Sequence, residues 1–286
     1  RMLPNVLRKD LLVLRYEGLD EVTREARIQF SPEPLEITAS QATFDIELDP
    51  KGETTVAVMV ACDVGDSHRP LLAYDAAMAE AGLAFGAEQT EDCTIQTSNA
   101  QFNEWWNRSV LDVRMMVTDT NEGPYPYAGV PWFSTPFGRD GVITALECLW
   151  IRPELARGVL AYLASTQAKE VNPGQDAEPG KILHETRKGE MAALNEIPFG
   201  LYYGSVDSTP LFVMLAGAYY ERTADLAFIQ SIWANLEAAL TWMDTFGDPD
   251  RDGFVEYVRK SPTGLDNQGW KDSHDSISHE DGLLAE

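Results

Sequence analysis

From residue 99 onward the chain alternates between two kinds of helical segment. Residues 99–119 and 226–246 carry apolar side chains at intervals of three and four, which predicts helices with one buried face. Residues 142–150 and 211–220 have few polar side chains, which predicts helices buried on nearly every side. An inner ring of helices wrapped by an outer ring produces such an alternation, so we expect an α/α toroid. A large irregular helical bundle, which also mixes buried and surface helices, is the alternative.

Proline marks the start of a further helix, at Pro153, and of the apolar helix over 211–220. Pro153 is typical of the first position of a helix, and Thr209 followed by Pro210 is typical of an N-cap and a first position. Residues 168–207 are expected to form a long loop between these two helices. Because binding and catalytic residues lie on loops more often than in helices, we expect functional residues in this loop.

The first part of the chain has the two-residue alternation of β-strands. We expect strands at 11–16, 25–30, 42–48 and 54–62. Residues 1–65 are therefore predicted to form part of an antiparallel β-sandwich, and because four strands are few, we expect strands before Arg1 or a partner sheet. Residues 66–97, an Ala-rich stretch and a polar run, are expected to form a linker with a helix.

The charge and the cysteines limit the class of partner and the compartment. Asp and Glu number 46 against 22 Lys and Arg, and the net charge of -24 argues against nucleic acid or an anionic membrane surface. A neutral glycan is compatible with this charge, and no apolar run is long enough to span a bilayer. Cys62, Cys93 and Cys148 lack C-x-x-C spacing, so we expect no disulfide framework, no zinc site and a reducing, cytoplasmic location. No cofactor is expected, and the oligomeric state stays open.

Aromatic side chains flank a charged pair in residues 131–150. The group consists of Trp132, Phe133, Phe137, Arg139 and Asp140. Aromatic rings stack on the apolar faces of sugars, and charged side chains form strong hydrogen bonds to hydroxyl groups, so the pattern predicts a carbohydrate site. A buried aromatic cluster with an ion pair and a capping Asp is the alternative.

Three carboxylates occupy comparable positions in successive loops. Asp140, Asp207 and Asp272 are separated by 67 and 65 residues. In a ring of helical hairpins these loops meet at one mouth, toward which the helix N-terminal dipoles point. Glycoside hydrolysis requires one carboxyl group to protonate the leaving oxygen and another to act as base or nucleophile. An apolar neighbour such as Trp270 would raise the pKa of Asp272 and keep it protonated.

Further candidates lie in the same loops, and each has an alternative. These candidates are His184, Glu185, Arg187, Tyr202, Tyr203, Trp270 and Lys271. His184 and Glu185 are equally compatible with a solvated surface ion pair, and Asp140 and Asp207 with simple helix caps. Asp248, Asp250 and Asp252 imitate part of a calcium loop, but its twelfth position is Arg259 instead of Glu, so a tight turn before a short hairpin is preferred.

Four segments, in order along the chain, resemble the bacterial glycogen debranching enzyme or amylo-α-1,6-glucosidase-like family of six-hairpin glycosidases. These segments are 131–150, 180–185, 202–212 and 267–276. The resemblance implies an (α/α)6 toroid behind an N-terminal β-sandwich and inverting hydrolysis of α-1,6-linked glucose at glycogen branch points. It implies that Asp272 is the general acid and that Arg139 and Asp140 bind the sugar at the cleaved end. It also implies that the pocket is lined by Trp132, Phe137, Tyr203, Asp207 and Trp270.

One departure from this family limits the expected activity. The family's catalytic base is a Glu in the later hairpins, so we expect it beyond Glu286. Residues 98–286 are then the N-terminal half of the toroid, and this fragment is expected to be inactive alone. A six-hairpin glycosidase acting on trehalose, a mannosyl-oligosaccharide or a rhamnoside is an alternative, and so is a non-catalytic glycan-binding protein. An Asp272→Asn substitution separates hydrolysis from binding alone.

Overall fold

The computed structural model describes residues 1–89, 93–271, 273 and 277–283. The chain divides into two compact units, Arg1–Glu91 and Asp92–Glu286. Within the described residues, none of the helices combines the length and the apolar character that crossing a membrane requires.

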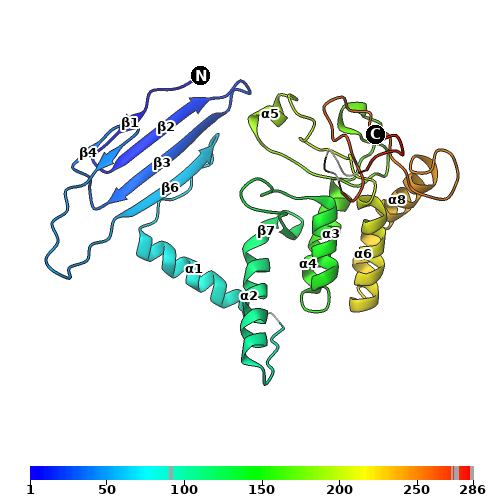
Figure 1. The fold of residues 1–286 in the computed structure, drawn as a ribbon, viewed down its shortest axis with the longest axis horizontal. Coiled ribbons are helices and arrows are strands. Elements are labelled where there is room, and N and C mark those ends of the chain that lie inside the picture. The colour runs from blue at the N-terminus through cyan, green and yellow to red at the C-terminus, as the bar shows by residue number, and fades with distance from the viewer. Residues whose placement is uncertain (90–92, 272, 274–276, 284–286) are drawn as a thin grey trace. The chain divides into compact units, whose positions relative to one another are not determined.

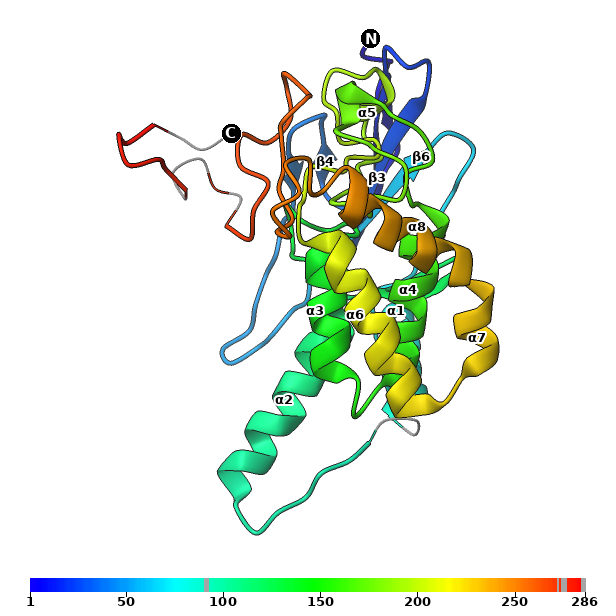
Figure 2. The ribbon, with the colours of Figure 1, turned by 90° about the vertical axis from the view of Figure 1, so that its right-hand side faces the viewer.

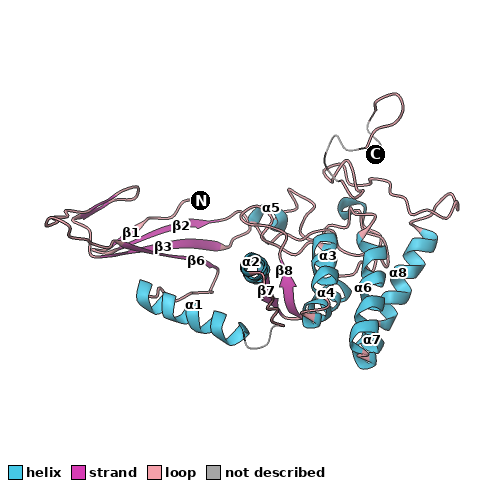
Figure 3. Ribbon diagram, turned by 60° about the horizontal axis from the view of Figure 1, so that its bottom comes forward, coloured by secondary structure: helices cyan, strands magenta, loops and turns pink. Residues whose placement is uncertain are grey.

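The N-terminal unit contains one four-stranded antiparallel sheet (Figures 1 and 3). Its strands, in spatial order, are β1 (Val6–Leu7), β2 (Leu11–Glu17), β3 (Thr23–Ser31) and β6 (Ala57–Val64). A small hairpin of β4 (Glu36–Ile37) and β5 (Ala42–Thr43) lies between β3 and β6 in the sequence. Helix α1 (Tyr74–Gln89) follows the sheet and falls inside the segment expected to hold a linker helix.

Register places Leu12, Ile28 and Val60 on one face of the sheet, whereas the buried Val13 and Ala61 lie on the other. Ile28 of β3 stands opposite Leu12 of β2 on one side and Val60 of β6 on the other. Leu12 is buried, but the side chains of Val58 and Val60 are 55% and 60% exposed. The two-residue alternation therefore identifies which side chains share a face. On the edge strand β6, however, the side chains of that face are exposed to solvent.

The prediction of a strand over 42–48 is wrong for most of its length. The strand ends at Thr43, and residues 44–49 form no ladder. Phe44 packs edge-on against Phe30, with ring centroids 6.0 Å apart, and the residues after it are exposed. Alternating polarity fixes which side chains share a face, but a strand also needs a neighbour to accept and donate its backbone hydrogen bonds.

The second unit is mainly helical. Its helices are α2 (Ala100–Met116), α3 (Gly138–Cys148), α4 (Pro153–Ser165), η1 (Pro173–Gln175), α5 (Glu190–Ala193), α6 (Ser208–Thr223), α7 (Leu226–Ser231) and α8 (Trp233–Thr245). A two-stranded ribbon, β7 (Val117–Thr120) and β8 (Gly123–Pro126), joins α2 to the rest. The core of this unit lies where α3, α4, α6 and α8 pack together, and it includes the fully buried side chains of Val142, Leu163 and Phe212.

Several helix boundaries differ from those expected. The apolar helix predicted over 142–150 begins earlier, at Gly138, and so includes Arg139 and Asp140 in its first turn. The prediction that Thr209 is an N-cap is wrong, because α6 begins at Ser208 and the Thr209 hydroxyl instead accepts a hydrogen bond from the backbone N–H of Ile182 at 2.9 Å. The stretch 226–246 is divided into α7 and α8 rather than forming one helix.

Long and short connections alternate along the helical unit. Residues 149–152 join α3 to α4, and 224–225 join α6 to α7, whereas the connection from α4 to α6 covers 166–207. Helices α3 and α6 pack against each other and begin at the same end, since a Cβ atom on Gly138 would lie 2.9 Å from the Ser208 hydroxyl oxygen. Figure 2 shows the long connections gathered at this end of α3 and α6. The N-termini of α3 and α6 therefore meet among the long loops.

Candidate functional site

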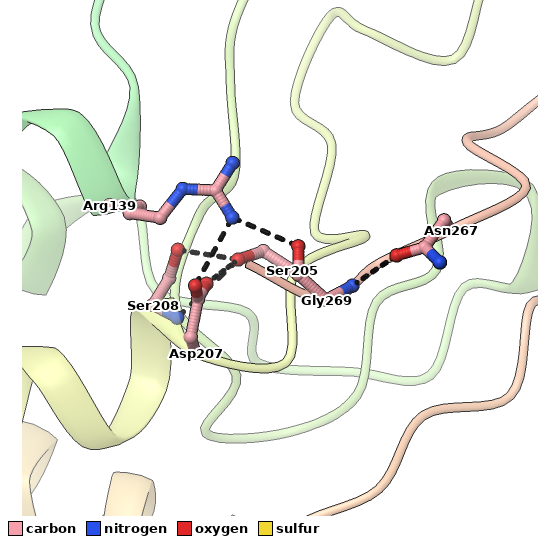
Figure 4. Close-up of polar contacts among 6 residues, drawn as sticks. All are labelled: Arg139, Ser205, Asp207, Ser208, Asn267 and Gly269. Carbon is pink, nitrogen blue, oxygen red and sulfur yellow. Dashed lines mark hydrogen bonds and ion pairs between the residues drawn. The ribbon is translucent and has the colours of Figure 1, made fainter. Parts of the chain in front are cut away.

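Three segments that are distant in the sequence meet at the side chain of Arg139 (Figure 4). Arg139 lies in the first turn of α3, and its Nη1 donates to Asp207 Oδ2 at 3.1 Å and to the carbonyl oxygen of Gly269 at 3.0 Å. Asp207 occupies the N-cap position of α6, and Gly269 belongs to the loop that follows α8. The Arg139 and Asp207 side chains are only 11% and 18% exposed, so the ion pair is partly shielded from water.

Strand β8 and the 166–207 loop hold the start of α3 in place. The Tyr125 hydroxyl donates to the carbonyl oxygen of Phe137 at 2.7 Å, and the N–H of Gly138 donates to the His184 carbonyl at 2.8 Å. Tyr125 is completely buried. These bonds set the direction in which the first turn of α3 presents Arg139.

Asp207 is oriented by the two serines beside it. The Ser205 hydroxyl donates to Asp207 Oδ1 at 2.6 Å and lies 2.8 Å from the Ser208 hydroxyl. Among the described residues the Asp207 carboxylate makes no capping bond to α6, although it stands at the N-cap position. The carboxylate is therefore directed at Arg139 instead of at its own helix. The sequence gives only a weak sign of this orientation, namely that Ser205 and Ser208 stand close to Asp207 on either side.

Asp140 lies beside Arg139 in the first turn of α3, where the helix dipole favours a negative charge. The N-cap of that helix is Phe137, so Asp140 is not the cap residue. Asp140 in the first turn of α3 and Asp207 at the N-cap of α6 therefore lie at the same end of the helical unit.

An exposed indole ring borders this ion pair. The Trp270 ring centroid lies 5.6 Å from the guanidinium carbon of Arg139, and Trp270 is 62% exposed. Lys271 next to it is also exposed. Asp272, for which an acid role is expected, lies outside the described residues. An exposed ring in cation–π contact with a partly buried Arg is able to stack on a ligand while the Arg binds its polar groups.

The aromatic residues of the segment before α3 differ in exposure. Trp132 and Phe133 are 78% and 52% exposed, whereas Phe137 is buried. Arg187 connects this segment to the 166–207 loop, because its Nη1 donates to the Trp132 carbonyl at 2.6 Å and its guanidinium lies 5.5 Å from the Phe137 ring centroid. Trp132 and Phe133 are thus available to solvent, and Phe137 belongs to the support behind them.

His184 and Glu185 are buried, so they do not form a solvated surface pair. The His184 ring packs edge-on against Phe137 and Tyr202, with centroids 5.5 and 5.9 Å away. Burial, reinforced by the positive charge of Arg139, lowers the pKa of His184 to about 3, so its imidazole is neutral near pH 7. Glu185 accepts from Arg187 Nε at 2.7 Å. Both side chains are therefore held inside the helical unit by neighbouring side chains.

Tyr203 lies apart from the Arg139–Asp207 pair. Its hydroxyl donates to the Thr166 carbonyl at 2.6 Å, and its side chain is buried. It borders a cavity of about 480 Å³ whose lining includes Gln167 and Asn172 but neither member of that pair. The structure thus separates Tyr203 from the other residues expected to line one pocket.

The acidic group after α8 has the geometry of a turn. Carboxylate oxygens of Asp248, Asp250 and Asp252 lie within 4.8 Å of one another, as a cation site would need. Asp248 and Asp250, however, accept from backbone N–H groups of Asp252 and Gly253 at 2.9 to 3.1 Å, as in a tight turn. Residues 251–260 contain no strand, so the expected hairpin is not formed.

A second group of possible metal ligands lies on the sheet. Glu25, Asp63 and His68 also approach within 4.8 Å. Arg15 and Arg27 already form 2.6 Å ion pairs with Glu25 and Asp63. This arrangement is explained by ion pairing across the strands.

Comparison with known proteins gives a match for the N-terminal part of the chain. Residues 1–59 match the family model of the N-terminal domain of (some) glycogen debranching enzymes. A comparison with curated proteins found no match. The matched residues include β1 to β5 and the start of β6. The similarity to glycogen debranching enzymes thus covers the strands of the N-terminal unit up to the start of β6.

Proposed function

We propose that this protein is a glycoside hydrolase that binds an α-glucan beside Arg139 and hydrolyses α-1,6-linked glucose at branch points. The observation that carries the proposal is the pair of hydrogen bonds from Arg139 Nη1 to Asp207 and to Gly269, made next to the exposed ring of Trp270. The match of residues 1–59 to a domain of glycogen debranching enzymes makes a glucan the preferred substrate class.

Recognition would use three kinds of group at this site. The Trp270 ring offers an apolar face for one side of a pyranose, and the Asp207 carboxylate retains lone pairs that can accept from sugar hydroxyls. Arg139 donates to hydroxyl oxygens and holds Asp207 in place. The opposite charges of Arg139 and Asp207 cancel, which suits a neutral ligand.

For catalysis we assign Asp272 as the general acid by resemblance, because it matches the aspartate that follows Trp and one further residue in related glucosidases. An inverting mechanism needs a second carboxylate about 6.5 to 9.5 Å away to activate water. The resemblance implies that this base is a Glu carried by the later hairpins of the family's toroid. Asp140 and Asp207 would then bind sugar hydroxyls rather than transfer protons.

The proposal includes an α/α toroid as the architecture of the helical unit. Support comes from the alternation of short and long connections and from an apolar groove of about 240 Å³ between α6 and the α7–α8 pair. The groove is lined by residues that include Val213, Tyr220, Trp233 and Leu240. In a toroid, the next helical hairpin would pack against such a face.

The test compares Asp272→Asn with the wild type in the polypeptide as its gene encodes it. Glucose release from an α-1,6-branched glucan is expected to fall by about two to four orders of magnitude, because the acid can no longer donate a proton. Affinity for the glucan should change little. Equal turnover in the two proteins would contradict the proposal, and binding by a wild type that shows no hydrolysis would favour a glycan-binding protein.

A further inference from the structure

Asp176 is a buried carboxylate outside the Arg139 site. It follows the short helix η1 with a left-handed backbone conformation (φ of 51°) and is only 2% exposed. Among the described residues it accepts four hydrogen bonds: at Oδ1 from the backbone N–H groups of Lys260 and Ser261 (2.6 and 2.9 Å), and at Oδ2 from the Tyr202 hydroxyl and Gln268 Nε2 (2.9 and 3.0 Å). A buried charge is stable only with such partners, and hydrogen bonds to a charged acceptor are strong.

Three of these four donors belong to one segment, residues 260–269. Tyr202 holds the middle of the same segment, because its hydroxyl also accepts from the N–H of Leu265 at 2.8 Å. Gly264 packs so closely that a Cβ atom there would lie 2.5 Å from the Tyr202 hydroxyl and 2.9 Å from Asp176 Oδ2. The segment contains no helix or strand, so its shape depends on these side-chain contacts.

The end of this segment forms part of the Arg139 site. The Gln268 carbonyl accepts from the N–H of Val206, one residue before Asp207, at 2.9 Å, and the Gly269 carbonyl accepts from Arg139. Gln268 therefore contacts Asp176 with its side chain and the start of α6 with its backbone. A displacement of residues 260–269 would move the Gly269 carbonyl and Trp270 together.

We propose that Asp176 is a positioning residue, which holds residues 260–269 so that Gly269 and Trp270 face Arg139 in the geometry that binds glucan. The proposal rests on the proposed function for the role of the site, and adds a residue that itself touches neither Arg139 nor Trp270. Its distinguishing consequence is local: loss of the carboxylate loosens one segment and weakens ligand binding while the helices stay intact.

The experiment uses Asp176→Asn, which has almost the same shape. The Asn oxygen can still accept from Lys260 and Ser261, but its NH₂ group cannot accept from the Tyr202 hydroxyl and Gln268. Amide hydrogen exchange and the affinity for panose, a trisaccharide with one α-1,6 bond, are measured for wild type and variant. The matched control is Asp244→Asn, since Asp244 is an exposed carboxylate on α8.

The expected result has three parts. Exchange of the amides in 260–269 becomes at least about tenfold faster while the amides of α3, α4 and α6 keep their protection, because opening is confined to one segment. The dissociation constant for panose rises about tenfold or more. Saturating panose slows exchange of 260–269 again in the variant, because a ligand stabilises the conformation that it binds. Asp244→Asn changes none of these.

Tyr202→Phe provides a second variant if Asp176→Asn does not fold. It removes only the hydroxyl that joins Asp176 to Leu265, and is expected to produce the same local effects to a smaller degree. Faster exchange throughout the helices would mean that Asp176 contributes to stability in general, and would overturn the proposal. Faster exchange in 260–269 with unchanged affinity would overturn it as well. If wild type does not bind panose, the proposed function fails, and the exchange data still decide whether Asp176 orders the segment.

Discussion

The N-terminal sheet and the helical unit bury their apolar side chains to very different extents. In the sheet, Val58 and Val60 of β6 remain more than half exposed, although they share a face with the buried Leu12. In the helical unit, Leu163 of α4 and Phe212 of α6 are fully buried. The pattern of apolar residues thus indicates which side chains share a surface, and only a packing partner decides whether that surface is buried.

The two units also differ in which of them matches a known family and which contains the candidate site. The family match falls on the sheet, whereas the Arg139 site lies among the long loops of the helical unit. Packed helices provide fixed N-termini from which Arg139 and Asp207 can be presented, as a binding site on a rigid scaffold requires. We therefore expect substitutions in the helical unit to have the larger consequences.

The largest contrast in stability is expected between two side-chain truncations, one in each unit. Phe212→Ala should lower the free energy of unfolding of the helical unit by about 3 to 5 kcal/mol, because it leaves a cavity in a closed core. Val60→Ala, at a side chain that is 60% exposed, should cost less than about 0.5 kcal/mol. Urea denaturation of each variant measures both values. Similar losses in the two variants would mean that the exposed face of β6 is covered in solution.

Two glycines in the helical unit should respond to alanine in opposite directions. A Cβ atom on Gly158 of α4 would overlap the Pro124 carbonyl oxygen, so Gly158→Ala should destabilise by about 3 kcal/mol. Gly217 of α6 is exposed with nothing within 4 Å of a Cβ, so Gly217→Ala should stabilise by about 0.5 to 1 kcal/mol. Melting temperatures of the pair test this packing, and a neutral Gly158→Ala would refute the contact between α4 and β8.

The pH dependence of the helical unit should depend on His184. Burial lowers the pKa of His184 from 6.5 to about 3, so the unfolded chain binds a proton below pH 6.5 that the folded chain does not. The free energy of unfolding should therefore fall by about 1.4 kcal/mol per pH unit below pH 6.5, or about 2 kcal/mol by pH 5. The stability is fully present above pH 6.5. Denaturation at several pH values should show this slope in wild type and its loss in His184→Gln, whereas an unchanged slope would assign it to another group.

The sheet should respond to acid only at lower pH, and with the smallest effect. Arg27 and the backbone N–H of Arg69 hydrogen-bond Asp63 and lower its pKa from 3.8 to about 2. The stability that this carboxylate contributes is present above pH 3.8 and is lost as the pH falls toward 2. Following the Asp63 carboxyl carbon by NMR measures this directly. Titration of Asp63 near pH 4 would show that the Arg27 contact does not persist in solution.

The sequence predicts the helical elements better than the sheet. Pro153 begins α4 as expected, and the apolar run 211–220 lies inside α6. Residues 44–48 alternate as a strand would but have no pairing partner. Periodicity reports the preferences of a segment itself, whereas strand formation depends on a distant segment that local sequence does not specify.

The candidate site is predictable in part. The aromatic and charged residues of 131–150 point to Arg139, and the spacing of the carboxylates points to Asp207. The burial of His184 and the separation of Tyr203 depend on how the 166–207 loop folds, which no local pattern shows. Asp176 gives no signal in the sequence, because its importance comes from donors more than twenty residues away.

The most direct test of the account is a calorimetric titration with panose of wild type, Trp270→Ala and Trp105→Ala. Trp105 on α2 is 62% exposed, as Trp270 is, so it controls for the loss of an exposed indole. We expect wild type to bind, Trp270→Ala to bind about tenfold more weakly because a stacking ring is worth roughly 1.4 kcal/mol, and Trp105→Ala to bind like wild type. Absence of binding, or equal weakening by both substitutions, would contradict a glucan site at Arg139.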